Sequence, residues 1–155
     1  MHRKGTEQLG LDAFLRRHRR VAIDSCIFIY ELEANPRYVA LARRVFAWLE
    51  KPGNTAVTST ITMTEILTLP YQGADDSQAD TYFGLLSTYS HLEWVPPDLQ
   101  MARMAARFRA SHRLRTPDAI QAATAIRSGA QGFISNDKIF RRVEGLETLI
   151  LDEQL

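Results

Sequence analysis

The chain has 155 residues, of which 45% are hydrophobic and 24% charged, as expected for one folded domain and too apolar for a largely disordered chain. No segment approaches the ~18 consecutive apolar residues that a membrane-spanning helix needs. The N-terminus is charged throughout and lacks the apolar run of a signal peptide. A single cysteine, Cys26, excludes an internal disulfide. These features predict a protein of the reducing cytoplasm, without a membrane partner.

The net charge is only +1, but the charges are unevenly distributed along the chain. Residues 1–20 carry a net +4, residues 21–100 a net −6 and residues 101–155 a net +3. Sixteen of the nineteen cationic side chains are arginines, and the planar guanidinium suits phosphate. This balance permits a nucleic-acid partner without establishing one.

Apolar runs alternate with helical periodicity along the chain, which predicts a mainly parallel sheet covered on both faces, an α/β fold. We expect strands at 21–23, 55–58, 92–95, 132–135 and 148–151. We expect helices at 9–18, 25–33, 36–50, around Glu65, and at 75–90, 98–112, 116–128 and 137–142. Residues 1–19 are expected to form an arginine-rich helical extension, and residues 20–155 the domain itself.

Two of these helices have apolar stripes that we expect to face the core. The expected buried residues are Tyr82, Phe83, Leu85 and Leu86 on one helix and Leu99, Met101, Ala102, Ala105 and Phe108 on the other.

Four acids lie at positions where a parallel sheet binds ligands. Asp24 directly follows the first strand, Glu65 lies about two helical turns beyond the second, and Asp137 follows the fourth. Ligands of open α/β sheets bind beyond the carboxyl ends of the strands, so these three acids share one edge. Asp118 lies in the first turn of its helix, where strand order places it less directly.

Each acid also has a purely structural alternative. These are a helix cap at Asp24 or Ser25, a capping box over Thr62 to Glu65, a favourable helix-dipole position for Asp118, and a further cap at Asp137. Taken singly, none of the acids indicates a site. Four carboxylates converging to about 5 Å, however, would repel by ~3 kcal/mol per pair, or about 20 kcal/mol in all. That exceeds the stability of a typical domain, so convergence would require protons or a hard divalent cation such as Mg²⁺ or Mn²⁺.

Four segments of the sequence resemble the PIN-domain family, and more specifically the VapC ribonuclease toxins of toxin–antitoxin pairs. They are VAIDS at 21–25, TEIL at 64–67, TPDAIQAATA at 116–125 and ISND at 134–137. The resemblance covers about residues 20–152. It implies a three-layer α/β/α sandwich with a five-stranded, mainly parallel sheet. The extension at residues 1–20 departs from the family, because many such toxins begin almost at the first strand.

The resemblance also implies an activity and a set of partners. Asp24, Glu65, Asp118 and Asp137 match the family's catalytic and metal-binding acids, and Ser25 and Asn136 match its supporting polar positions. The implied function is Mg²⁺- or Mn²⁺-dependent hydrolysis of RNA phosphodiester bonds by the toxin of a toxin–antitoxin pair. The implied partners are RNA, a cognate antitoxin protein and a second copy of the chain.

Arginines flank the expected site and could hold RNA phosphates, or could simply form a solvated basic face. They are Arg113, Arg115, Arg141 and Arg142. Two other functions remain open. One is a catalytically silent PIN-like module whose acids hold a structural ion or a partner. The other is a phosphoacceptor or phosphatase-like domain using Asp24, for which Lys138 is the only lysine near the strand ends.

Overall fold

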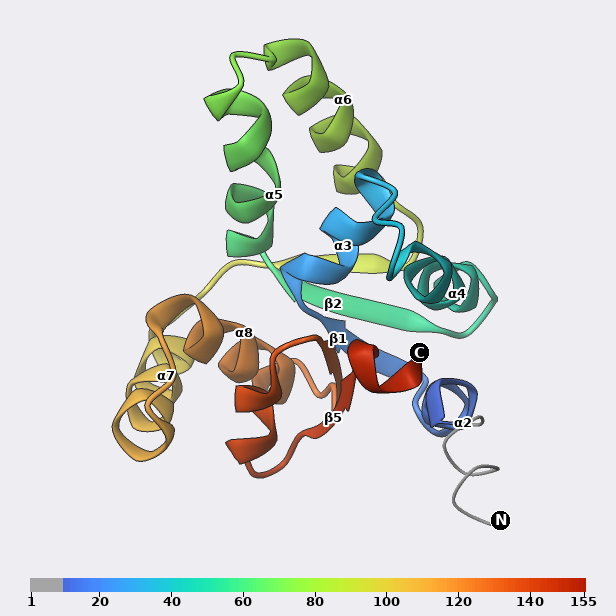
Figure 1. Ribbon diagram of the computed structural model, residues 1–155. Helices are drawn as coiled ribbons and strands as arrows, with labels where there is room; N and C mark the ends of the chain where they lie inside the picture. The colour runs from blue at the N-terminus through green and yellow to red at the C-terminus, as the bar shows by residue number, and fades with distance from the viewer. Residues whose placement is uncertain (1–9) are drawn as a thin grey trace.

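A computed structural model describes residues 10–155 and shows a five-stranded, all-parallel sheet with the strand order β3-β2-β1-β4-β5 (Figure 1). The strands are β1 (Arg20–Ile23), β2 (Thr55–Ser59), β3 (Leu92–Val95), β4 (Gly132–Ser135) and β5 (Glu147–Ile150). β1 lies at the centre, where Val21 pairs with Ala56 of β2 and Ile23 with Ile134 of β4. The chain adds β2 and β3 on one side of β1 and then β4 and β5 on its other side. This switch point lies between β1 and β4, so the ligand-binding crevice is expected at the carboxyl ends of these two strands.

Seven α-helices and two short 3-10 helices accompany the strands within residues 10–155. The α-helices are α2 (Gly10–Arg17), α3 (Ser25–Leu32), α4 (Val39–Leu49), α5 (Ile61–Gln72), α6 (Asp76–Ser87), α7 (Leu99–His112) and α8 (Thr116–Arg127). The 3-10 helices are η1 (Lys138–Arg142) and η2 (Leu151–Gln154). The predicted α/β class and five parallel strands are confirmed. No helix within residues 10–155 is long and apolar enough to span a membrane.

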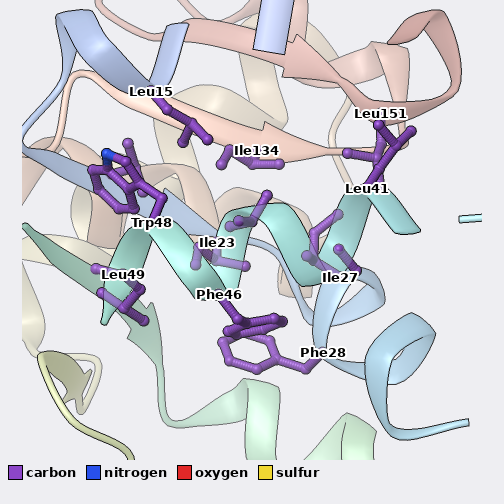
Figure 2. Close-up of a cluster of buried hydrophobic side chains, with 14 of the residues drawn as sticks. Leu15, Ile23, Ile27, Phe28, Leu41, Phe46, Trp48, Leu49, Ile134 and Leu151 are labelled. Atoms are coloured by element: carbon purple, nitrogen blue, oxygen red, sulfur yellow. The ribbon is translucent and has the colours of Figure 1, made fainter. Parts of the chain in front are cut away.

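The sheet separates two apolar cores because successive side chains of a strand point to opposite faces. Val21 and Ile23 of β1 pack into the core formed with α2, α3 and α4, whereas Ala22 packs into the core formed with α7 and α8. The first core is the larger one. Figure 2 shows Phe28 of α3 lying against Phe46 of α4, with ring centroids 5.4 Å apart. The result is the three-layer arrangement visible in Figure 1.

The helix α2 packs into this first core. Its three large apolar residues are at most 5% exposed: Leu11, Phe14 and Leu15. Arg44 of α4 donates a hydrogen bond to Asp12 of α2 on the surface. Residues 10–17 are therefore packed as part of the folded unit. The remainder of the predicted extension, residues 1–9, lies outside the described residues.

Several local predictions are wrong. The helix expected from residue 36 begins at Val39, because the Asn35 side chain accepts hydrogen bonds from the backbone N–H groups of Arg37 and Tyr38 and holds a turn before the helix. On α6, Phe83 and Leu85 are 51% and 53% exposed.

On α7, Leu99 is 86% exposed and Ala102 is also exposed. Leu99 is the first residue of this helix, and no other part of residues 10–155 covers its side chain.

Candidate active site

Asp24 lies at the centre of the candidate site, where β1 ends and α3 begins. Its side chain caps α3 by accepting a hydrogen bond from the Ser25 backbone N–H at 2.9 Å, so the predicted capping role is real. The other carboxylate oxygen accepts a hydrogen bond from the Ser135 hydroxyl of β4 at 2.7 Å. Asp24 is only 8% exposed. Its two hydrogen bonds therefore fix its orientation from two different elements.

Burial raises the pKa of Asp24 to about 6, because a buried carboxylate loses the hydration that stabilises its charge. The hydrogen bonds from Ser135 and Ser25 oppose this rise. The neighbouring carboxylates of Glu65 and Asp118 add to it. Asp24 thus lies within electrostatic reach of two acids that are distant in the sequence.

Glu65 projects from α5 beyond the end of β2. Partial burial raises the pKa of its carboxyl; the Ser25 side chain opposes the rise and the charge of Asp118 adds to it. The predicted capping box over Thr62 to Glu65 does not form, because α5 already begins at Ile61, after Thr60. Thr62 is instead buried within the helix. Glu65 is therefore free of the capping role.

Asp118 lies in the first turn of α8, as predicted, and is half-buried. Burial raises the pKa of its carboxyl, Arg115 lowers it through an ion pair at 3.4 Å, and the charge of Asp137 raises it. These electrostatic effects join all four predicted acids in one cluster: Asp24 to Glu65 and Asp118, Glu65 to Asp118, and Asp118 to Asp137.

Asp137 follows β4 and caps η1, accepting a hydrogen bond from the Ile139 backbone N–H at 3.0 Å. Its own backbone N–H donates to the Ser135 hydroxyl at 3.0 Å. Ser135 therefore connects the acids at 24 and 137 through one oxygen. Sequence reasoning did not include Ser135 in the site. The signal available in the sequence was its position at the end of the predicted strand 132–135.

The two supporting positions inferred from the family have different surroundings. Ser25 is buried beside Asp24 and Glu65. The Asn136 amide donates to the Tyr30 hydroxyl at 2.9 Å, and its carbonyl accepts from the Asp152 backbone N–H at 2.8 Å. Asn136 thus ties the β4 loop to α3 and η2, and both ends of its side chain are occupied.

A buried polar network sets the helices of Glu65 and Asp118 relative to the sheet. The Gln121 amide of α8 donates to the Thr62 hydroxyl at 2.6 Å, and the Thr58 and Thr62 hydroxyl oxygens lie 2.7 Å apart. The Thr58 hydroxyl donates to the Ile23 carbonyl at 2.9 Å, next to Asp24. Buried polar groups that satisfy one another in this way hold their elements in one arrangement.

The donor set suits a hard divalent cation, because all four groups are carboxylates and such cations prefer oxygen ligands. Within residues 10–155, no three His, Cys, Asp or Glu side chains are already close enough together to hold a metal ion. The charges of neighbouring carboxylates nevertheless raise the pKa values of Asp24, Glu65 and Asp118. A cation would relieve that repulsion, so the chemistry of the residues fits a divalent ion.

A parallel α/β sheet with an acid cluster at the ends of its central strands defines the class of this protein, and the family model for the PIN domain matches residues 21–146. The chain therefore belongs to the PIN-domain family. No curated protein matches the sequence.

Solved structures confirm the predicted resemblance to VapC toxins. The fold is similar to VapBC2 from Rickettsia felis, with a TM-score of 0.66, 18% identity, and coverage of 84% of this chain and 98% of that chain. It is similar to VapBC-1 from nontypeable Haemophilus influenzae, with a TM-score of 0.66, 20% identity, and coverage of 85% and 98%. It is also similar to VapC20 from Mycobacterium tuberculosis, a sarcin–ricin loop cleaving toxin, with a TM-score of 0.64, 20% identity, and coverage of 79% and 93%.

Proposed function

We propose that this protein is a divalent-cation-dependent endoribonuclease and the toxin of a toxin–antitoxin pair. The observation that carries the proposal is the joining of four carboxylates in one electrostatic cluster at the strand ends of a PIN domain. The RNA-cleaving activity described for the similar VapC20 supports the choice of substrate.

Asp24, Asp118 and Asp137 are proposed to hold Mg²⁺ or Mn²⁺, which supplies Lewis acidity toward a phosphodiester when bound. Ser25 and Ser135 orient the Asp24 carboxylate for this task. Glu65 has a raised pKa and carries no capping role, so it suits accepting the proton of the attacking water. Attack of the water oxygen on phosphorus breaks the P–O3′ bond and yields a 5′-phosphate and a 3′-hydroxyl.

Cleavage of a labelled RNA by Asp118→Asn tests the proposal. We expect a loss of at least about 100-fold with Mn²⁺, because even groups that merely support a metal ligand contribute 10–100-fold. Asp80→Asn, which changes an exposed aspartate on α6, should cleave at the wild-type rate. Equal rates in Asp118→Asn and Asp80→Asn would refute the assignment. A wild-type protein that binds Mn²⁺ but cleaves no RNA would favour the silent module.

An apolar groove with an acidic rim is proposed as the binding site of the antitoxin. The groove has a volume of about 160 Å³, and α3, α4, α6 and the residues after α6 line it with Phe28, Glu31, Leu32, Phe46, Glu50, Leu85, Leu86 and Tyr89. It suits a segment with apolar anchors and basic side chains. The Rickettsia, Haemophilus and Salmonella neighbours are VapBC systems, which supports such a partner.

Co-expression with the product of an adjacent reading frame tests the groove. The product should relieve growth inhibition by the wild-type protein but not by Leu85→Glu, since the new charge would enter the groove. Relief of both proteins alike would contradict this site. A homodimer stays a prediction, which light scattering on the purified protein measures.

A further inference from the structure

The arginines that sequence reasoning placed around the acids are largely occupied by other groups. Arg115 pairs with Asp118, and Arg141 forms two hydrogen bonds with Glu153. Arg142 donates to the His112 carbonyl at 3.0 Å. A guanidinium that already faces a carboxylate offers less charge to a phosphate. Other arginines of the described residues have no such partner.

Three such arginines line a cleft between α7 and α8. The cleft has a volume of about 230 Å³ and is formed by Gln100, Arg103, Met104, Arg107 and Arg127. The four α7 residues follow the spacing i, i+3, i+4 and i+7, so they share one helix face. Met101 and Ala105, on the other side of α7, are buried. The arginines are thus presented by a helix whose opposite side is anchored in the core.

The charge of this cleft is uncompensated. No carboxylate lines it. Within the part of the chain that the structure describes, the side chains of Arg103, Arg107 and Arg127 form no ion pair or hydrogen bond, whereas nine ion pairs occur elsewhere in it. Like charges held near one another repel, so an anion between them is stabilised. Guanidinium groups donate paired hydrogen bonds that match phosphate oxygens.

The same helix carries the cleft and part of the candidate active site. Asp118 lies in the first turn of α8 and Arg127 is its last residue. Nine residues of α-helix separate them by about 14 Å along the axis. A few nucleotides of a single strand can span this distance. The cleft is therefore placed to hold a phosphate of a strand whose scissile bond lies at the acids.

We propose that Arg103, Arg107 and Arg127 form a second contact site for the RNA backbone, holding phosphates a few nucleotides away from the bond that is cleaved. This inference rests on the proposed function, because it takes RNA as the substrate. It assigns substrate affinity to the α7–α8 cleft and leaves the chemical step to the acids. The contact is to phosphates, so it carries no sequence preference of its own.

Binding of a fluorescent single-stranded RNA in EDTA tests the cleft without cleavage. We expect Arg103→Gln/Arg107→Gln to weaken binding at least tenfold and to lower the salt slope of log K by about 1.4, since each lost phosphate contact on a single strand removes ~0.7. The charge-matched control is Arg37→Gln/Arg43→Gln, which removes two exposed arginines that face carboxylates. This control should bind RNA like the wild type.

Equal losses in both double variants would overturn the proposal, because the effect would then be one of net charge. So would a changed oligomeric state of Arg103→Gln/Arg107→Gln without weaker RNA binding. A third outcome would also overturn the proposal: pyrophosphate binds the wild-type cleft, but the wild type and Arg103→Gln/Arg107→Gln bind RNA with the same affinity. The cleft would then be a site for a free anion. Cleavage with Mn²⁺ is measured separately, and Arg103→Gln/Arg107→Gln should raise KM and leave kcat unchanged. A wild-type protein that binds RNA through the cleft but never cleaves it would refute only the proposed nuclease activity.

Discussion

Replacing Asp24 with asparagine should favour the folded state more at neutral pH than at acidic pH, although Asp24 is the central acid of the candidate site. The buried carboxyl has a pKa of about 6 in the folded protein, against an ordinary value of 3.8. Between these two pH values the folded state binds more protons than the unfolded state, so the free energy of unfolding falls as the pH rises. Well above pH 6 the ionised Asp24 lowers the free energy of unfolding by its full amount. Asparagine carries no such cost at any pH.

The pKa shift sets the size of the effect. The ionised Asp24 destabilises the fold by about 3 kcal/mol at pH 7.5 and by about 1 kcal/mol at pH 4.5. Any hydrogen bond that asparagine makes less well than aspartate contributes equally at both pH values. The stability difference between Asp24→Asn and wild type should therefore be about 2 kcal/mol larger at pH 7.5 than at pH 4.5.

Urea unfolding at the two pH values measures this difference, with EDTA present so that bound divalent ions do not offset the repulsion. Subtracting the wild type at each pH removes the contributions of other titrating groups, such as the paired Glu147 and Glu153, whose pKa values are lowered. Asp80→Asn serves as the exposed control. A difference for Asp24→Asn that does not change with pH would refute the argument that burial and neighbouring carboxylates raise the pKa of Asp24.

Two further predictions concern Ser135 and α2. Ser135→Ala removes a hydrogen bond that lowers the pKa of Asp24, so the acidic limb of the pH–rate profile for RNA cleavage should move to higher pH. Ser135→Thr keeps a hydroxyl and should restore the limb to its wild-type position. An acidic limb that does not move in Ser135→Ala would exclude this positioning role. Phe14→Ala should lower the free energy of unfolding by about 3–5 kcal/mol, as for other buried phenylalanines, because Phe14 is only 2% exposed; a loss below about 1 kcal/mol in urea unfolding would show that α2 is peripheral.

The sequence predicted the strand ends well because those signals are local. Asp24 directly follows a short apolar run, and Asp137 follows another, so alternation of strands and helices was enough to place both at one edge. The role of Ser135 could not be found in this way. It depends on β4 lying beside β1, and strand order is set by packing between segments more than 100 residues apart in the sequence.

Packing also explains the predictions that were wrong. Helical periodicity shows which residues share a face, but not whether another element covers that face, so Phe83, Leu85 and Leu99 were wrongly placed in the core. The capping box over Thr62 to Glu65 fails for a related reason. The Thr62 hydroxyl is engaged by Gln121, 59 residues away, so a tertiary contact replaces the local one.

A titration with Mn²⁺ at pH 7.5, followed by electron paramagnetic resonance of the free ion, tests most directly whether the four carboxylates bind a divalent cation. We expect saturable binding by the wild type and by Asp80→Asn. We expect at least tenfold weaker binding by Asp118→Asn, because a direct ligand contributes at least as much as its supporting groups. Equal affinities for Mn²⁺ in the wild type and Asp118→Asn would contradict it.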